Sequence, residues 1–186
     1  VAYLSDGTQV PAGQPRFEVG KFGKAVMVEE WTDNLIALNK NNYTMSGLLN
    51  FKILTPTGFE AELNGSTDIW HYVRWDLSLP VGKYTIQFDL TPNLTQGYFC
   101  LGIGPATFNY PTDYLYTVIA SPDSSALVHK EFTFEVTDGS TPTRVIFFKI
   151  HYGGGSVKVE HVQLEQKPYA TSFIDGTRSP ETLTIP

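Results

Sequence analysis

The sequence predicts an all-β protein, an antiparallel β-sandwich of the jelly-roll type. Short segments rich in Val, Ile, Phe, Tyr and Thr recur every ~10–15 residues. Most of these segments alternate apolar with polar side chains, which is the pattern of a half-buried strand. Turn sequences built on Gly, Pro, Asn and Asp separate them, without helical patterns in between. Strands that follow one another without helices favour two packed antiparallel sheets.

Alternation assigns the faces of the predicted strands. The strands are Trp70–Asp76, Lys83–Leu90, Tyr114–Ala120, Lys130–Val136, Arg144–Tyr152 and Ser156–Leu164. Turns are expected at 79–82, 91–93, 104–105, 109–113, 121–123, 138–139 and 153–155. The side chains expected in the core are Val73, Trp75, Leu77, Tyr84, Ile86, Phe88, Leu90, Phe132, Phe134 and Val136. Within Trp70–Asp76, Lys83–Leu90 and Lys130–Val136, the residues that alternate with this core set then face outward.

Composition narrows the function classes. The net charge is −6, with 13 Lys and Arg among 19 acids, which excludes a basic nucleic-acid surface. No apolar run approaches the ~18 residues that a membrane span needs. Cys100 is the single cysteine, so an internal disulfide is impossible. Charged residues make up 17% and aromatics 13%, so we expect a ligand or another chain to cover part of the surface.

The chain divides into a central sandwich and two flanks. We expect an N-terminal flanking segment or hairpin over 1–34, a jelly-roll domain over 35–170, and a C-terminal flank or linker to a following module over 171–186. The flanks are expected to pair with each other or with a neighbouring module. The start at Val1, without Met or a signal-peptide pattern, predicts a processed product or an excised fragment.

The two ends carry a resemblance to known modules. Ala2–Val10, Pro15–Glu18, Gly20–Ala25 and Val28–Ile36, with the closing Val159–Phe173 and Asp175–Arg178, resemble segments of phage tail structural proteins and of Gram-positive surface or secreted proteins. The block between such ends is similar to a carbohydrate-binding-module jelly roll, a galactose-binding-like sandwich. These modules often read Glu-Gly-Thr-Thr-Asn-Leu where this chain has Glu30-Trp-Thr-Asp-Asn-Leu35, so Trp31 and Asp33 depart from the pattern. The resemblance implies an extracellular, bacterial-surface or virion location.

Outward aromatic and polar side chains suggest a sugar-binding site. A sugar ring has an apolar C–H face and a polar rim, which match a flat aromatic ring beside carboxylate, amide or guanidinium groups. The candidate residues are Trp70, Tyr72 and Arg74 on one strand, Gln87 and Asp89 expected on the next, and Tyr98, Tyr110, Tyr114 and Tyr116 as an extension. The alternative is that these aromatics seal the sandwich edge or pack beneath the terminal segments.

Catalytic and metal sites have weaker support. Glycosidases need two suitably spaced carboxyl groups. Glu131 and Glu135 would lie ~13 Å apart and Glu60 and Glu62 ~7 Å apart along their strands. The second pair is near the required spacing but has no acid or base partner, so we expect no enzyme. The histidines His71, His129, His151 and His161 are isolated and have no metal spacing, and the sequons at Asn42, Asn64 and Asn93 are attributed to chance.

No cofactor is expected to be required. The resemblance implies that a structural Ca²⁺ could lie between the first and last strands. Oxygen ligands are available at Glu29, Glu30, Asp33, Glu160 and Glu165, without an assignment among them.

The sequence therefore predicts a non-catalytic polysaccharide-binding module of a phage tail or bacterial surface protein. Its partner would be a polysaccharide or cell-surface glycan, bound by stacking and hydrogen bonds. The alternative is a virion or surface-assembly domain whose exposed aromatics contact other subunits. Nucleic acid and membrane insertion are not expected.

Overall fold

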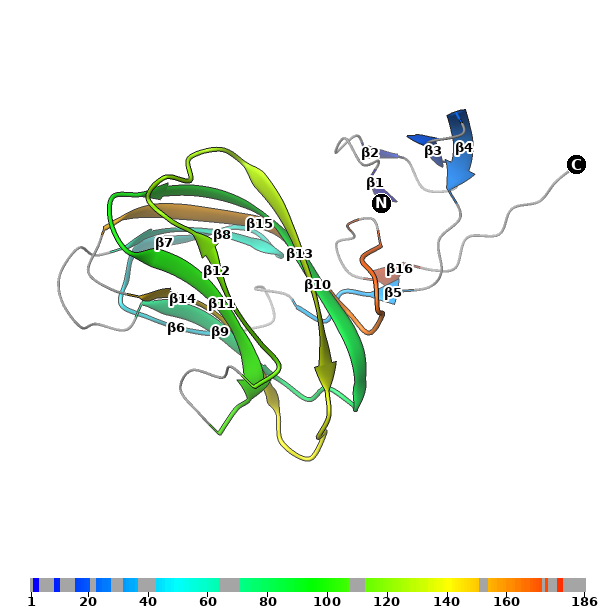
Figure 1. Ribbon diagram of the computed structural model, residues 1–186. Helices are drawn as coiled ribbons and strands as arrows, with labels where there is room; N and C mark the ends of the chain where they lie inside the picture. Colours follow the sequence, from blue (N-terminus) through cyan, green and yellow to red (C-terminus); the bar gives the residue numbers. More distant parts are fainter. Residues whose placement is uncertain are drawn as a thin grey trace, which may run out of the picture.

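Two five-stranded antiparallel sheets pack face to face. The computed structural model describes residues 2–3, 9–10, 16–20, 23–27, 32–36, 43–63, 71–107, 113–150, 154–171, 173 and 177–178. Figure 1 shows the two layers of strands. None of the described residues belongs to a helix with the length and hydropathy needed to cross a bilayer. The predicted all-β antiparallel sandwich is confirmed.

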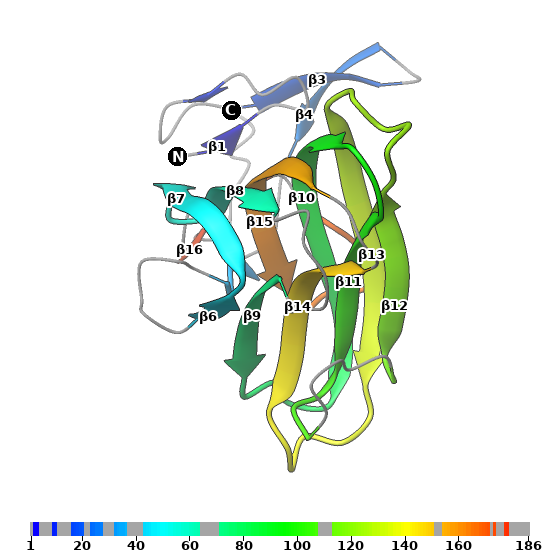
Figure 2. The ribbon, with the colours of Figure 1, turned by 90° about the vertical axis from the view of Figure 1, so that its left-hand side faces the viewer.

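The first sheet has the strand order β13–β10–β15–β8–β7. Its strands are β7 (Leu48–Thr55), β8 (Gly58–Leu63), β10 (Gly82–Leu94), β13 (Val128–Val136) and β15 (Gly155–Glu165). The second sheet has the order β12–β11–β14–β9–β6 and faces the viewer in Figure 2. Its strands are β6 (Tyr43–Ser46), β9 (Tyr72–Leu77), β11 (Tyr98–Pro105), β12 (Leu115–Ala120) and β14 (Thr143–Ile150).

Three short pairs lie outside these sheets. They are β1 (Ala2–Tyr3) with β2 (Gln9–Val10), β3 (Arg16–Gly20) with β4 (Gly23–Met27), and β5 (Thr32–Asp33) with β16 (Thr177–Arg178). The last pair joins the two flanks of the chain, a pairing that the sequence led us to expect. The strand-like stretch at 182–185 lies outside the described residues.

The core between the sheets is built on aromatic rings from both layers. Phe147 of β14 is fully buried, and its ring lies 5.0 Å from Phe88 and 6.0 Å from Phe59 of the first sheet. It also lies 6.1 Å from Trp75 and 6.3 Å from Phe99 of its own sheet. The strand faces that alternation assigned are confirmed: Val73, Trp75, Tyr84, Ile86, Phe88, Leu90, Phe134 and Val136 are buried, and Leu77 and Phe132 are partly buried against them.

Two predicted turns are wrong and four strands were missed. The stretch 104–105 is not a turn, because β11 continues through it to Pro105. The stretch 91–93 is not a turn, because β10 continues through it to Leu94. Pro92 is tolerated there because β10 pairs only with β15 beyond Leu90, so the missing N–H of proline breaks no second ladder. Strands β6, β7, β8 and β11 were not predicted, although Phe59, Ala61 and Leu63 of β8 alternate with exposed acids.

Residues 34–36 anchor the N-terminal flank to the sandwich. The Nδ2 of Asn34 donates to the carbonyl of Val162 (2.8 Å), and its Oδ1 accepts from the backbone N–H groups of Ile36 and Leu164 (both 3.1 Å). Asn34 is buried, and Ile36 belongs to the core. A buried amide with these three bonds fixes where the chain enters the sandwich.

Candidate functional site

The outer face of the second sheet carries an apolar cluster of its own. Cys100, Ile146 and Phe148 are buried together, apart from the main core, and Tyr72 packs against them. The register places Tyr72 opposite Phe148 and Phe148 opposite Cys100, so these side chains form a row across β9, β14 and β11. We name this surface the aromatic face, with the outward residues Tyr72, Arg74, Asp76, Tyr98, Cys100, Tyr116, Val118, Arg144, Ile146 and Phe148.

The aromatic face has a buried floor and an exposed rim. The ring of Tyr116 lies 6.2 Å from that of Phe148, and its hydroxyl lies 3.8 Å from the Cys100 Sγ. Gly102 of β11 is the register partner of Tyr116 and has no side chain to separate the two rings. Burial raises the pKa of the Cys100 thiol, which keeps it protonated near neutral pH. Tyr98, Tyr116 and Val118 are 41%, 46% and 45% exposed, so solvent reaches the rim.

Charged groups line one side of this face. The Arg74 guanidinium carbon lies 5.3 Å from the centre of the Tyr72 ring, within cation–π range. Asp76 follows Arg74 by two residues on β9. Its two carboxylate oxygens accept hydrogen bonds from Nε and Nη2 of Arg144, both at 2.7 Å, which form a two-bond fork. The Asp76 hydrogen bond raises the pKa of Arg144, so this guanidinium stays charged.

The structure brings together part of the predicted site. Tyr72, Arg74, Tyr98 and the suggested extension Tyr116 share the aromatic face. Tyr114 lies elsewhere, because it packs against the main core and its hydroxyl donates to the carbonyl of Asp138 (3.4 Å). Trp70 and Tyr110 lie outside the described residues.

Gln87 and Asp89 do not belong to this surface. The expectation that they lie on the strand beside Tyr72 is wrong, because β9 and β10 are consecutive in the chain but belong to different sheets. Their side chains face outward from the first sheet, opposite to Ile86 and Phe88 in the core. A sandwich connection that crosses from one layer to the other leaves no trace in the alternation of either strand.

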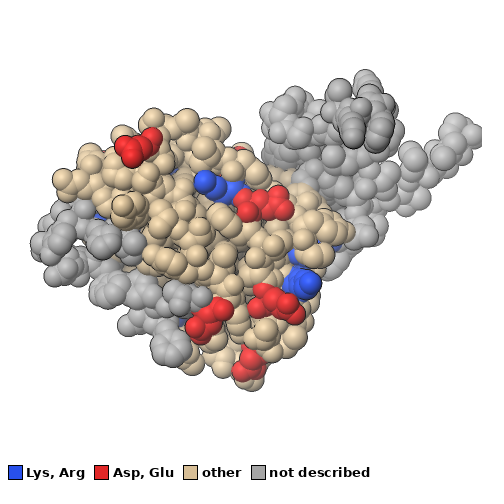
Figure 3. All heavy atoms as spheres, viewed as in Figure 1, with Lys and Arg blue, Asp and Glu red and all other residues tan. Residues whose placement is uncertain are grey.

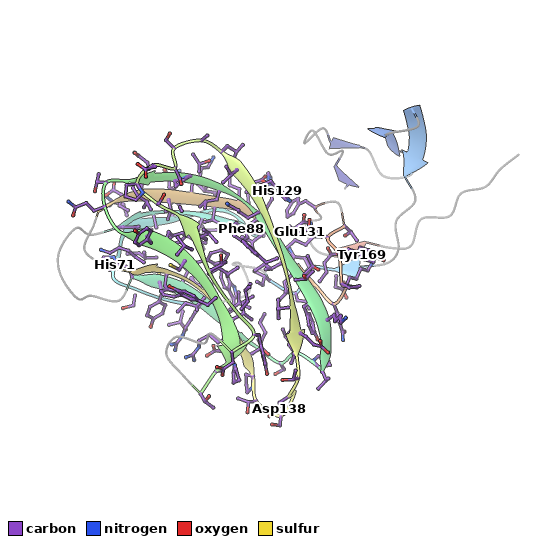
Figure 4. The ribbon with its side chains drawn as sticks, viewed as in Figure 1. His71, Phe88, His129, Glu131, Asp138 and Tyr169 are labelled. Carbon is purple, nitrogen blue, oxygen red and sulfur yellow. The ribbon has the colours of Figure 1, made fainter. Side chains whose placement is uncertain are left out.

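A segment after β15 covers part of the outer face of the first sheet. We call residues 166–171 and 173 the strap. Gln87 Nε2 donates to the Thr171 carbonyl (2.5 Å), and Thr85 Oγ1 donates to the Lys167 carbonyl (2.9 Å). Glu165 accepts from the N–H (3.0 Å) and hydroxyl (2.6 Å) of Thr171. Figure 4 shows Tyr169 of the strap beside the part of β13 that carries Glu131. Gln87 is 6% exposed and serves the strap.

Asp89 holds two histidines that the sequence treated as isolated. His129 Nδ1 donates to Oδ1 and His161 Nδ1 donates to Oδ2, both at 2.8 Å. His161 has φ 53° and lies where the β10–β15 register shifts between Gln87 and Asp89. The ring of His161 also lies 4.7 Å from Phe173 of the strap. Pairing across three strands brings these residues together, which sequence spacing could not predict.

The other titratable candidates are dispersed. His71 is buried, and its pKa is lowered by burial and by Lys149, so it is neutral at pH 7. Glu62 accepts from Asn50 on the first sheet, where Glu60 is the neighbouring outward acid. Glu131 accepts from the N–H of Ala170 (3.3 Å), and Glu135 points outward on the same strand. His151 lies outside the described residues.

The described residues do not assemble a metal site. Within them, groups of three or more His, Cys, Asp or Glu suited to a metal ion are absent. Of the candidate calcium ligands, Glu165 accepts hydrogen bonds from Thr171, and the Glu160 carboxylate lies 2.8 Å from the Lys158 ammonium. Glu29 and Glu30 lie outside the described residues, and a calcium requirement stays a prediction.

A shallow pocket lies away from the aromatic face. It has a volume of about 220 Å³, below the ~300–1,000 Å³ usual for small-molecule sites. Its walls come from Asp33, Leu35, Ser78, Leu79, Pro80, Tyr84, Gln166 and Lys167. The pocket therefore sits where the N-terminal flank, the β9–β10 loop and the strap meet.

Comparison with solved proteins identifies the fold. Models of known protein families gave no match, and neither did curated proteins. Among solved structures, a module described under "CBM4 structure and function" is 14% identical, covers 75% of this chain and 96% of its own, and has a TM-score of 0.50. The sandwich has the fold of a carbohydrate-binding module. This confirms the carbohydrate-binding-module-like jelly roll that the sequence resembles.

Two further similar structures have lower scores. The second N-terminal cellulose-binding domain of Cellulomonas fimi β-1,4-glucanase C is 16% identical over 77% of this chain and 95% of its own, with a TM-score of 0.46. The enzymatically active domain of bacteriophage CBA120 tailspike protein 4 is 11% identical over 73% of this chain, with a TM-score of 0.44. This chain spans only 18% of that tailspike chain.

Proposed function

We propose that this chain is a non-catalytic carbohydrate-binding module and that the aromatic face is its ligand site. The observation that carries the proposal is the pair of exposed rings, Tyr98 and Tyr116, beside Tyr72 and Arg74 on an outer sheet face with its own buried floor. Such rings stack on the C–H face of a sugar, while guanidinium groups donate to its oxygen atoms. The carbohydrate-binding-module fold supports this assignment.

The acids of the aromatic face favour binding over hydrolysis. Asp76 is the carboxylate that the described part of this face carries, and both of its oxygens are held by Arg144. Hydrolysis of a glycosidic bond commonly needs two carboxyl groups flanking the bond. A single, already paired carboxylate therefore suits a module that binds without cleaving.

The flanking segments suggest the location of the protein. Because both ends resemble those of phage tail and Gram-positive surface or secreted proteins, we propose an extracellular position on a virion or a bacterial surface. The partner would then be a polysaccharide of a cell envelope or of the surrounding matrix.

Affinity electrophoresis through gels that contain individual polysaccharides tests this function. The Tyr116→Ala variant should bind about tenfold more weakly, since an aromatic contact contributes ~1–1.5 kcal/mol and 1.4 kcal/mol is tenfold in affinity. Tyr169→Ala is the matched control, because this tyrosine is 48% exposed on the strap. Retention by no polysaccharide, or equal retention of both variants and the wild type, contradicts the proposal.

A subunit interface is the second candidate. β12 is an edge strand of the second sheet, and its Tyr116 and Val118 are exposed apolar side chains. Exposed apolar edge strands are prone to pair with other chains. Light scattering separates the two functions: a stable trimer or larger assembly that buries the aromatic face favours assembly, and a monomer favours glycan binding.

A further inference from the structure

The charge of the aromatic face differs from that of the whole chain. The chain has a net charge of −6. The outward charged side chains that the described part of this face carries are Arg74, Asp76 and Arg144. Asp76 and Arg144 neutralise each other in their two-bond fork. The remaining charge is the cation of Arg74, so the face is locally positive on an acidic protein whose surface charges are sparse in the view of Figure 3.

Arg74 is held in place by the Tyr72 ring, but its Nε lacks a hydrogen-bond acceptor among the described residues. Its guanidinium lies 5.3 Å from the centre of the Tyr72 ring, which orients the plane of the group. Its register partners Ile146 and Thr44 carry no charge. Its Nε is buried and has no hydrogen-bond partner among the described residues. Buried donors nearly always have an acceptor, so an Nε without a partner, on a guanidinium beside a solvent-exposed rim, is consistent with an acceptor supplied by a ligand.

The neighbouring arginine shows which acceptor fits best. Arg144 binds the two carboxylate oxygens of Asp76 through Nε and Nη2. Planar guanidinium groups favour this paired geometry with carboxylates and phosphates over single bonds to neutral hydroxyl groups. An acidic group on a sugar would give Arg74 the counter-charge that Arg144 already has.

We propose that the aromatic face selects polysaccharides whose sugars carry an acidic group, with Arg74 as the residue that recognises the anion. The inference rests on the proposed function, because it assigns the ligand class of the same site. Stacking on the tyrosine rings supplies affinity for any sugar chain. An ion pair between Arg74 and an acidic group adds a charge-dependent contribution to the binding free energy, which a neutral polysaccharide lacks.

Matched polymers test this selectivity with the intact protein. Polygalacturonate is compared with its carboxyl-reduced form, which keeps the chain and removes the charge, and with a teichoic acid, which carries phosphodiesters. We expect the wild type to bind at least one acidic polymer about tenfold more tightly than the neutral one, since a charge-assisted hydrogen bond is worth ~1.5–3 kcal/mol. The two acidic polymers show whether the anion is a carboxylate or a phosphate.

Variants locate the effect. Arg74→Gln should lose the preference for the acidic polymer and the dependence of binding on salt, because it removes the cation that pairs with the anionic group. Lys52→Gln is the control, because it removes one positive charge from an exposed site on the first sheet. Retained preference in Arg74→Gln overturns the role of this arginine. The wild-type comparison of polymers decides the ligand class even if that variant folds poorly.

The possible failures are distinguishable. Equal or tighter binding of the neutral polymer by the wild type overturns the inference and leaves the proposed function in place. Absence of binding to every polymer, acidic or neutral, overturns the proposed function and the inference together.

Discussion

Asp89 links three strands of the first sheet through its two carboxylate oxygens. It accepts hydrogen bonds from His129 of β13 and His161 of β15. The hydrogen bond from His161 lowers the pKa of Asp89 despite partial burial, and the same bond raises the pKa of His161. The pair is strongest when the carboxyl group is ionised and the imidazole is protonated.

The contact between Asp89 and His161 should make the free energy of unfolding depend on pH. The depressed pKa of Asp89 gives stability that is present above its ordinary value of ~3.9 and lost as pH falls through the lower folded value. The raised pKa of His161 gives stability that is present below ~6.5 and lost as pH rises through the higher folded value. The free energy of unfolding lost in Asp89→Asn should therefore be largest between about pH 4 and 6.5.

Urea unfolding of the wild type and Asp89→Asn from pH 4 to pH 9 checks this window. Asp123→Asn, in the exposed turn between β12 and β13, is the control and should show no such pH dependence. A loss in Asp89→Asn that is the same at pH 5 and pH 9 would contradict the assignment.

At the scale of elements, the strap buries one part of the outer face of the first sheet. Thr85, Gln87, Gln163 and Glu165 alternate with core residues and would be exposed on a bare sheet, yet all four are buried. Gln163 Nε2 donates to the Thr171 hydroxyl (3.3 Å), which adds to the bonds from Gln87 and Glu165. The aromatic face has no such cover in the described chain, so the two outer faces serve different purposes.

A substitution beneath the strap should lower stability and leave polysaccharide binding unchanged. Gln87→Ala should lower the free energy of unfolding by ~1 kcal/mol, because it removes the hydrogen bond from a buried amide to the partly buried carbonyl of Thr171. Binding to polysaccharide should not change, because Gln87 lies on the sheet opposite to the aromatic face. Chemical unfolding and affinity electrophoresis measure the two effects.

Gln96→Ala is the matched control for this substitution, since Gln96 is exposed between β10 and β11 and should be neutral in both measurements. Weaker binding by Gln87→Ala, with unchanged stability, would contradict this prediction and indicate that Gln87 contacts the ligand.

At the scale of the whole molecule, Phe147 joins the two layers. Its ring contacts rings from β8 and β10 of one sheet and from β9 and β11 of the other. Its neighbour Phe148 points to the opposite side and belongs to the floor of the aromatic face. Adjacent residues of β14 thus serve the fold and the candidate site separately.

Truncation of this ring should weaken the entire sandwich. Phe147→Ala should lower the free energy of unfolding by ~3–5 kcal/mol, the usual range for a buried phenylalanine. Tyr116→Ala, which removes an exposed ring, should change it by no more than about 0.5 kcal/mol. Thermal and chemical unfolding give both values, and similar losses in the two variants would contradict the separation of core and site.

The predictability of fold and site differs for a physical reason. Alternation identified Tyr84, Ile86 and Phe88 as core residues because side chains on a strand point to opposite faces at every step. The same pattern placed Tyr72 and Arg74 outward, and they are on the aromatic face. It could not show that Gln87 and Asp89 face the other way, since alternation says nothing of which sheet a strand joins.

The sequence by itself determined the all-β class, six of the ten strands of the sandwich and the inward faces of three of them, because turn residues and period-two burial are local properties. It also indicated the resemblance to carbohydrate-binding modules that the fold bears out. Tertiary structure alone decided that β9 and β10 separate into different sheets and that the strap covers Gln87. It also decided that Asp89 meets two histidines and that Tyr116 lies against Phe148. These contacts join residues far apart in the chain, and only the pairing and stacking of strands brings them within reach.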